Sequence, residues 1–277
     1  MFKRVYLEIT NSCNLNCAFC EAVKKHDFMD INDIKSRLDE IKEVTNYVYL
    51  HVLGEPLLHP FFDEILSYTD KLGLNVQLVT NGTLLYKYPN LLDHKSLRKC
   101  SISIHSIDNL NISDDYFKTI DRLIDIVKDK EKQFLELRFY DEEHLAHNSK
   151  RYYEELKKRY PLENTTKKQS YRIAKNVYIY TQVLFHWPDI NDPIINDKGK
   201  CHGAIDMLGI LANGDVIICC LDAAGHTKVG NLKKDSLKEI LNSNPYLNIR
   251  NEMLKQHLVC DLCQRCTYRL RFDKEYK

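Results

Sequence analysis

The alternation of two hydrophobic periods along residues 4–183 is the strongest constraint on what this chain can fold into. Short runs rich in β-branched and aromatic residues alternate with segments whose apolar residues recur at helical spacing, which is typical of repeated βα units. Strands connected by helices in this way pack side by side in parallel. Six strands are expected, at Arg4–Thr10, Tyr47–Val52, Asn75–Thr80, Ser101–Ser106, Phe134–Tyr140 and Asn176–Val183.

The segments between these strands have the spacing of amphipathic helices. Ile34, Leu38 and Ile41 fall at i, i+4 and i+7. Gly73 is expected to end the next helix, and Ser113 to cap the one after it. Because an α/β fold collects its functional groups at the carboxyl ends of the strands, we expect the site in the loops that follow them.

The bulk composition excludes several kinds of partner. The 277-residue chain has 40 basic and 39 acidic side chains, for a net charge of +1, so no global field draws it to nucleic acid or to an anionic membrane. The N-terminus lacks the apolar stretch of a secretory signal, and no run approaches the ~18 apolar residues of a membrane span. We therefore expect a cytoplasmic protein without nucleic-acid or membrane partners.

Ten cysteines are unevenly placed along the chain. Because the cytoplasm keeps thiols reduced, metal ligation or catalysis accounts for them better than disulfides. Three lie within residues 13–20, six within residues 201–266, and only Cys100 stands between the two groups. Two separate metal sites are the simplest interpretation, with Cys100 as a small core residue.

Beyond the last predicted strand the amino-acid composition changes. Residues 186–200 are rich in Pro, Asp, Asn and Gly, which indicates a linker or lid. A small cysteine-rich module follows, in which residues 209–221 predict a hairpin with its turn at Asn213-Gly214, and residues 236–241 predict a short helix. We thus expect two domains, covering residues 1–185 and 186–277.

The loop after the first strand holds three cysteines within eight residues, in the sequence Cys13-Asn-Leu-Asn-Cys17-Ala-Phe-Cys20. Three soft ligands without a fourth nearby suit an iron–sulfur cluster that keeps one iron open to a non-protein ligand. Structural zinc is the alternative, although zinc prefers four closed ligands in paired CxxC knuckles.

Further motifs follow in chain order. Gly54-Glu55-Pro56 comes after the second strand, Thr80-Asn81-Gly82 ends the third, and Ser101-Ile-Ser-Ile-His-Ser106 forms the fourth. Each has a simple alternative as a turn, a helix-entry loop or a plain strand. Together with CxxxCxxC, over about the first two thirds of the chain, they resemble the radical S-adenosylmethionine (SAM) superfamily. The departure is Leu53 in place of the first glycine of that family's GGEP motif.

This resemblance implies a partial (β/α)6 TIM-like barrel of the α/β class that binds a [4Fe–4S] cluster and SAM. In the family the three cysteines, here Cys13, Cys17 and Cys20, hold the cluster, and the amino and carboxylate groups of SAM chelate the fourth iron. The Gly-Glu-Pro motif is implied to receive the SAM amino group, Ser103 to approach the ribose, and Arg138 to face the carboxylate. The residues implied to bind SAM are Phe19, Gly54, Glu55, Pro56, Asn81, Ser103 and Arg138.

The C-terminal module carries a second cysteine pattern, in which Cys201 precedes Gly214-x4-Cys219 and then Cys263-x2-Cys266. This pattern resembles the SPASM/twitch appendage of certain radical SAM enzymes, which implies a small cysteine-rich domain with an auxiliary [4Fe–4S] cluster. Six cysteines are fewer than the roughly seven or eight of a full two-cluster domain, so one twitch-like cluster is implied. The implied ligands are Cys201, Cys219, Cys263 and Cys266.

Two cysteines of the module are then spare. Cys220 is expected to be a buried thiol, and Cys260 is an alternative ligand because Cys260-x2-Cys263-x2-Cys266 contains two overlapping pairs. A zinc ribbon would use the same four ligands and remains open for this module.

The resemblance also implies a reaction. Reductive cleavage of SAM gives methionine and a 5′-deoxyadenosyl radical, which abstracts hydrogen from a substrate carbon, and the auxiliary cluster takes a second electron. The leading expectation is oxidative modification of a peptide or protein side chain; the alternative is dehydrogenation of a small-molecule alcohol or sugar. An external electron donor such as flavodoxin or ferredoxin is implied. An alternative of another class is a non-catalytic, zinc-stabilised binding protein.

Some questions are left open by the sequence. Only twelve residues precede Cys13, so any leader recognition is expected from another chain. His186 and Trp187 head the linker, as candidates either for lining the substrate mouth or for packing. No residue is singled out as catalytic acid or base, and the oligomeric state is not indicated.

Overall fold

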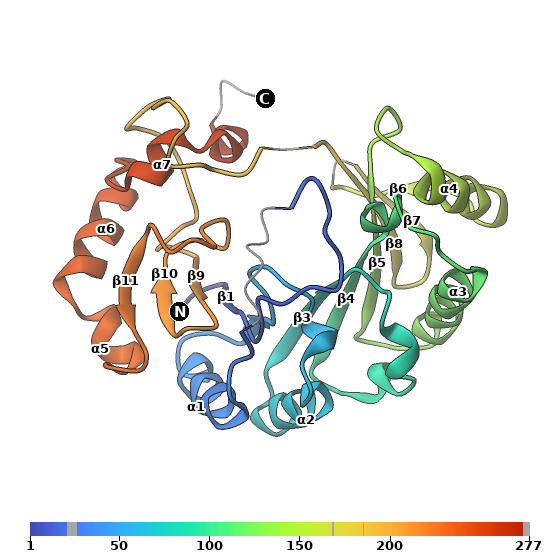
Figure 1. Ribbon diagram of the computed structural model, residues 1–277, viewed down its shortest axis with the longest axis horizontal. Helices are drawn as coiled ribbons and strands as arrows, with labels where there is room; N and C mark the ends of the chain where they lie inside the picture. The colour runs from blue at the N-terminus through green and yellow to red at the C-terminus, as the bar shows by residue number, and fades with distance from the viewer. Residues whose placement is uncertain (21–26, 168, 185, 274–277) are drawn as a thin grey trace. The chain divides into compact units, whose positions relative to one another are not determined.

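The computed structural model describes residues 1–20, 27–167, 169–184 and 186–273. The chain forms two compact units. The first comprises Met1–Cys13, Ala18–Gly54 and Phe185–Lys277, and the second comprises Asn14–Cys17 and Glu55–Leu184. Both contain parallel strands flanked by helices (Figure 1), so the predicted α/β class is confirmed.

Five strands of the first unit follow the order β11-β10-β9-β1-β2. β1 (Arg4–Leu7) lies between β2 (Tyr47–Tyr49) and β9 (Met207–Ile210) and is parallel to both. β10 (Asp215–Ile217) and β11 (Lys228–Asn231) extend this sheet in antiparallel fashion. The N-terminal strand is therefore bordered directly by a strand of the cysteine-rich module.

The predicted hairpin of that module is formed by β9 and β10. Gly214 has φ +90°, a left-handed value that glycine adopts without steric cost. The side chain of Asn213 accepts a hydrogen bond from the backbone N–H of Asp215 at 2.9 Å. The turn thus forms at the Asn-Gly pair that predicted it.

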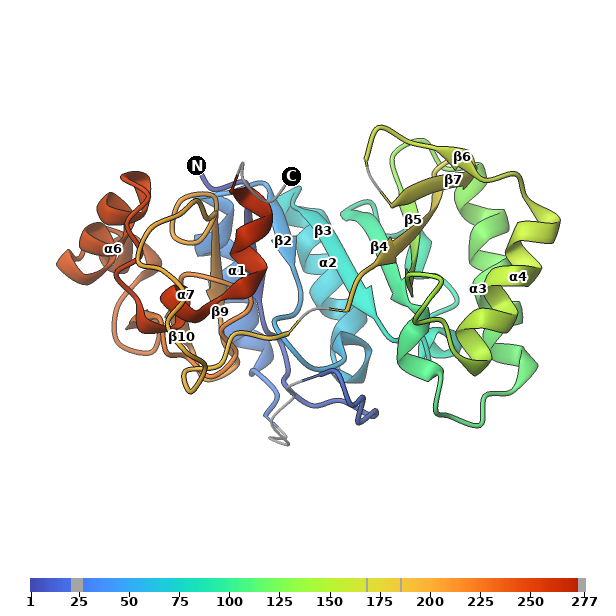
Figure 2. The ribbon, with the colours of Figure 1, turned by 90° about the horizontal axis from the view of Figure 1, so that it is seen from above.

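In the part of the chain that the structure describes, four helices accompany the first sheet, and Figure 2 shows three of them, α1, α6 and α7, from above. α1 (Ile31–Lys42) buries Ile34, Leu38 and Ile41 as predicted. Ser236 caps α5 (Leu237–Leu241) in a capping box with Glu239, which explains why this short helix forms. The other two helices, which the sequence did not predict, are α6 (Asn244–Leu254) and α7 (Asp261–Arg265), followed by a 3-10 turn at Thr267–Phe272.

The strands of the second unit follow the order β3-β4-β5-β8-β7-β6. The first four are parallel, and β7 and β6 are antiparallel additions that the sequence did not predict. The fourth strand begins at Leu97, earlier than predicted. It also ends earlier, at Ser103, because the chain then turns into a 3-10 helix, Ile104–Ile107. The bounds are β3 Asn75–Thr80, β4 Leu97–Ser103, β5 Phe134–Tyr140, β6 Glu163–Asn164, β7 Ser170–Ala174 and β8 Val177–Gln182.

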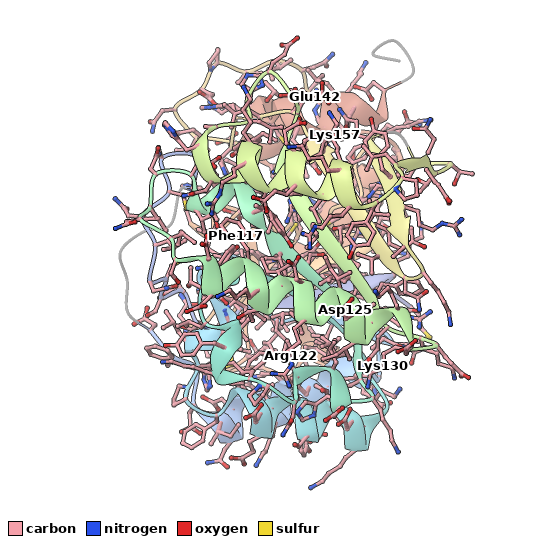
Figure 3. The ribbon with its side chains drawn as sticks, turned by 90° about the vertical axis from the view of Figure 1, so that its right-hand side faces the viewer. Phe117, Arg122, Asp125, Lys130, Glu142 and Lys157 are labelled. Atoms are coloured by element: carbon pink, nitrogen blue, oxygen red, sulfur yellow. The ribbon has the colours of Figure 1, made fainter. Side chains whose placement is uncertain are left out.

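Three helices cover one face of this sheet. α2 (Phe62–Leu72) ends at Gly73, whose φ of +63° confirms the predicted left-handed stop. Ser113 precedes α3 (Asp114–Lys128) as predicted, but no side-chain hydrogen bond caps the helix there. Figure 3 shows α3 beside α4 (His147–Arg159). Shorter 3-10 helices lie at Pro56–Leu58, Leu85–Lys87 and Leu91–Asp93.

The helices bury an aromatic and aliphatic core against the sheet. Phe117 of α3 contacts Tyr152 of α4 with 4.7 Å between ring centroids. Along β5, the buried Leu135, Leu137 and Phe139 alternate with half-buried polar residues that face the other way. No helix in the part of the chain that the structure describes has the length and apolar character to cross a membrane.

Candidate metal centres and cofactor site

The three N-terminal cysteines lie in the loop after β1. Cys13, Cys17 and Cys20 are half-buried. In the second unit, Cys17 Sγ lies 3.6 Å from the carbonyl oxygen of Ser106, just beyond β4. The middle of the loop therefore packs at the carboxyl end of a parallel strand, where the sequence predicted a site.

Asn14 fixes the same loop, and sequence reasoning missed it. Its side-chain oxygen accepts from Nδ2 of Asn81 at 3.0 Å, and its Nδ2 donates to Oγ1 of Thr83 at 2.8 Å. Asn81, a predicted SAM contact, therefore joins the cysteine loop to the loop after β3. Nothing distinguishes Asn14 in the sequence from other polar loop residues.

Gly54 is packed against the backbone that leads into the cysteine loop. Its φ is +78°, and a Cβ atom there would lie 2.5 Å from the carbonyl oxygen of Thr10 and 2.9 Å from that of Ser12. Both contacts are with backbone, which cannot swing aside as a side chain can. Glycine is thus required here by close approach as well as by conformation.

Glu55 is almost fully buried, at 1% exposure. Its carboxylate accepts hydrogen bonds from the backbone N–H of Leu57 at 3.0 Å and of Asn81 at 2.7 Å, and from the hydroxyl of Thr80 at 2.8 Å. Burial raises the pKa of Glu55 to about 7, against these three hydrogen bonds, which favour the charged form. The side chain therefore joins the Gly-Glu-Pro and Thr-Asn-Gly segments, and Pro56 begins the short helix that Glu55 caps.

Ser103 and Arg138 are register partners at the carboxyl ends of β4 and β5, so the structure brings these two predicted SAM contacts together. Nη2 of Arg138 donates to Oε1 of Gln182 at 2.7 Å, which orients the guanidinium group. The buried His105 ring lies 3.1 Å from the carbonyl oxygen of Arg138, and burial lowers the pKa of His105 to about 4. The neutral imidazole thus donates its Nδ1–H to that carbonyl.

Phe19 enters a contact with the linker. Its carbonyl oxygen accepts the indole N–H of Trp187 at 3.0 Å, within the first unit. Trp187 therefore packs beside the residue that precedes Cys20.

The four predicted auxiliary ligands line one cavity in the cysteine-rich module, which we call the four-thiol cavity. They come from the loop before β9, the end of β10 and α7 with the residue that follows it. Cys220 and Cys260 are not among the residues that line it. Arg269, which is 1% exposed, and Asp222 complete the polar part of the wall. The ligands in question are Cys201, Cys219, Cys263 and Cys266.

The chemistry of these donors fits an iron–sulfur cluster. Burial raises the pKa of Cys201 and of Cys266, and hydrogen bonds with Cys220 and Cys260 raise those of Cys219 and Cys263. Four buried thiolates repel one another, so the thiols keep their protons until a metal replaces them. Among the described residues no group of three His, Cys, Asp or Glu side chains is already closed around a point that would hold a single metal ion. The lining of soft ligands around a cavity suits a cluster.

Two family models match separate parts of the chain. Residues 7–137 match the radical SAM superfamily, and residues 201–267 match SPASM, an iron–sulfur cluster-binding domain. The chain thus carries a radical SAM domain followed by a SPASM domain. Together the two domains imply a SAM-binding [4Fe–4S] cluster and an auxiliary iron–sulfur cluster.

Curated relatives match the chain in part. A cofactor-modifying protein for tungsten-containing aldehyde ferredoxin oxidoreductase from Pyrococcus furiosus is 36% identical over 92 residues, which is 30% of this chain and 25% of that protein. An AdoMet-dependent heme synthase from Methanosarcina barkeri is 35% identical over 82 residues, 28% of this chain and 24% of that protein. The chain therefore spans about a quarter of the length of these relatives.

Solved structures share the fold over nearly the whole chain. BtrN in complex with AdoMet and 2-DOIA has a TM-score of 0.60 at 18% identity, covering 96% of this chain and 93% of that one. Streptococcus suis SuiB bound to the precursor peptide SuiA has a TM-score of 0.55 at 16% identity, covering 96% and 71%. At these identities the similarity is one of fold.

Proposed function

We propose that the protein is a radical SAM enzyme that oxidatively modifies a peptide or protein side chain. When bound, SAM and the two clusters supply the radical chemistry: cleavage of SAM to methionine and a 5′-deoxyadenosyl radical, hydrogen abstraction from a substrate carbon, and removal of a second electron. The protein's own residues bind these groups, orient them and exclude water.

In this proposal Cys13, Cys17 and Cys20 hold the catalytic cluster. The backbone of the Gly-Glu-Pro segment receives the SAM amino group, because the Glu55 carboxylate is already committed to three donors. The remaining SAM contacts are Phe19, Asn81, Ser103 and Arg138, of which Arg138 offers the positive charge that the SAM carboxylate requires.

The single observation that carries the proposal is the four-thiol cavity. Four cysteine ligands close a cubane cluster and leave no iron open to substrate, so a cluster here is suited to electron transfer rather than to substrate ligation. Removal of a second electron from a substrate radical gives a two-electron oxidation. An enzyme that rearranges its substrate without net oxidation does not need a second cluster as an electron acceptor.

A peptide substrate is supported by the fold similarity to SuiB, solved bound to the precursor peptide SuiA, and to anSMEcpe, solved with bound AdoMet and a Cp18Cys peptide. The reducing electron is proposed to come from flavodoxin or ferredoxin. A second candidate is dehydrogenation of a small-molecule alcohol or sugar. It is favoured by one observation: BtrN, which was solved with AdoMet and 2-DOIA, is similar in fold over nearly the full length of both chains.

The experiment that tests this proposal measures SAM cleavage in the absence of substrate, so the substrate need not be known. Anaerobically reconstituted protein is incubated with dithionite and SAM, and 5′-deoxyadenosine is measured by chromatography. We expect its formation in the native protein and its loss in Cys17→Ala, with retention in Cys100→Ala, which removes a buried thiol from the core. Native protein that forms no 5′-deoxyadenosine contradicts the proposal.

A further inference from the structure

A second cavity, of about 220 Å3, adjoins the four-thiol cavity. One wall is formed by residues 187–191 of the linker and the other by residues 221–226 after β10, with Leu262 of α7 between them. We call it the linker pocket. The two cavities share four lining residues: Pro188, Leu221, Asp222 and Leu262.

The linker wall is fixed at several points, so the pocket is preformed. At its start, Trp187 donates its indole N–H to the carbonyl oxygen of Phe19 at 3.0 Å. In its middle, Nε of Arg265 donates to the carbonyl oxygen of Ile190 at 2.9 Å. The backbone N–H of Ile195 then donates to the carbonyl oxygen of Gln264 at 2.9 Å. The wall is thus fastened both to the N-terminal cysteine loop and to α7, beside which it runs (Figure 2).

The opposite wall is held by a buried carboxylate. Asp222 is 1% exposed and accepts hydrogen bonds from the backbone N–H groups of His226 at 2.9 Å and Thr227 at 2.6 Å, and from the hydroxyl of Thr227 at 2.6 Å. These donors satisfy the carboxylate without a ligand. The loop is therefore held in place by its own hydrogen bonds, and Asp222 lies in the wall of the pocket.

The charge of the lining discriminates between ligands. Asp189 and Asp222 line the pocket, and Asp192 lies next to it, bonded through its carboxylate to the backbone N–H of Asp189 at 3.4 Å. None of the described residues that line the pocket is lysine or arginine. Asp192 is paired with the His186 ring at 2.8 Å. Asp189 and Asp222 have no lysine or arginine beside them among the described lining residues, so phosphate and carboxylate groups would lose their water there without gaining a cationic partner.

The linker pocket lies beside residues that adjoin both cysteine groups. Its wall residue Trp187 contacts the residue before Cys20, and its wall residue Leu262 precedes Cys263. A group bound there lies within the first unit beside residues next to both cysteine groups. Apolar surface from Trp187, Ile190, Leu221 and Leu262 offers burial to an organic side chain.

We propose that the linker pocket binds the substrate side chain that is oxidised, and that it accepts neutral or cationic side chains and excludes anionic ones. This rests on the proposed function, and it separates a peptide side chain from the nucleotide substrates named for other relatives, such as GTP 3′,8-cyclases. In this proposal Trp187 forms the aromatic part of the pocket wall and positions the bound side chain.

Trp187 is the single tryptophan of the chain, so its resonance is assigned without further variants. We would incorporate 5-fluorotryptophan into the anaerobic holoenzyme and follow its fluorine NMR resonance in the presence of SAM. The probes are N-acetyl-L-tyrosinamide, N-acetyl-L-lysinamide, N-acetyl-L-glutamate amide and GTP. We expect saturable shifts with the tyrosine and lysine probes and none with the glutamate probe or GTP.

A charge variant with a matched control sharpens the test. Ala224 is an exposed lining residue, so Ala224→Arg adds a cation to the pocket without disturbing the core. The lysine probe should bind roughly tenfold more weakly in this variant, and the glutamate probe should begin to bind. Asn242→Arg places the same charge at the exposed end of α5 and should leave all four titrations unchanged.

Binding of the glutamate probe or GTP to the native protein would overturn the proposal, as would the absence of any shift with the tyrosine and lysine probes. Equal effects of Ala224→Arg and Asn242→Arg would overturn it too. The proposed function fails separately, through the absence of 5′-deoxyadenosine, and a protein that binds the probes but does not cleave SAM would distinguish the two failures.

Discussion

The buried carboxylate of Glu55 accepts the backbone N–H of Asn81 at 2.7 Å, and this contact joins two loops that follow different strands. Asn81 in turn donates its side chain to Asn14, between the first two cysteines of the N-terminal loop. A chain of three residues thus runs from the Gly-Glu-Pro segment to the cysteine loop. Glu55 therefore holds these two segments of the candidate site together.

The pH dependence of stability follows from the raised pKa of Glu55. The folded protein binds this proton more tightly than the unfolded chain, so the group stabilises the fold at low pH, and that contribution is lost as pH rises from its ordinary 4.5 through about 7. In Glu55→Gln the loss, about 2 kcal/mol between roughly pH 5.5 and pH 8, should disappear. Urea unfolding of both proteins at several pH values measures it.

The same variant should be less stable than the native protein above about pH 7, by about 1–3 kcal/mol, because an amide NH2 group replaces an acceptor that faces backbone donors. Parallel stability curves for the two proteins between roughly pH 5.5 and pH 8 would contradict the raised pKa.

Gly54→Ala should damage the N-terminal metal site. The new Cβ would lie 2.5 Å from the carbonyl oxygen of Thr10, so the backbone before Cys13 must move. We expect the loss of about four irons per chain, together with destabilisation of at least about 2 kcal/mol. Gly73→Ala is the control, since Gly73 also has positive φ but no atom within 4 Å of the added Cβ. It should cost about 1 kcal/mol and keep its iron; equal iron loss in both variants would refute the explanation.

The auxiliary ligands are distinguished from their neighbours by single substitutions. Cys219→Ser and Cys266→Ser remove thiols that line the four-thiol cavity and should each lower the iron content by up to about four per chain. Cys220→Ser and Cys260→Ser should retain iron because these residues lie outside the lining. Iron and sulfide analysis of each variant shows which thiols are ligands. Iron loss in Cys260→Ser would assign that thiol as a ligand instead.

Glu8 links the first strand to both neighbouring segments. Its carboxylate accepts from the backbone N–H of Leu53 at 3.2 Å and of Ala212 at 3.0 Å, and the residue is 4% exposed. Glu8→Ala leaves two buried donors without this acceptor and should destabilise the protein by about 2–4 kcal/mol. The exposed Glu143→Ala should change the unfolding midpoint little, and a similar effect of the two would contradict this role for Glu8.

Much of the fold was predictable because its signals are local. The helix stripe of Ile34, Leu38 and Ile41, the stop at Gly73 and the turn at Asn213-Gly214 each depend on a few neighbouring residues. The pairing of β9 with β1 was not predictable, because it joins segments about 200 residues apart and leaves no mark in either. The short antiparallel β6 was missed because two residues carry no periodicity.

The residue types of the candidate site were predictable, but the residues that hold them in place were not. The resemblance to a SPASM/twitch module implied the four thiols that line one cavity, whereas Glu8, Asn14 and Trp187 act through contacts that only the fold creates. Glu55 was expected beside SAM, yet its carboxylate is engaged with Leu57, Thr80 and Asn81. The motif predicted the segment, and packing determined what its side chain does.

The most direct test of the central claim is the iron and sulfide content of anaerobically reconstituted protein, with EPR after dithionite reduction, in the presence and absence of SAM. The variant in which Cys13, Cys17 and Cys20 are all alanine is measured beside it. We predict about eight irons per chain in the native protein and about four in the variant, with SAM perturbing only the signal that the variant lacks. Bound zinc in place of iron, or a spectrum that SAM leaves unchanged, would contradict the account.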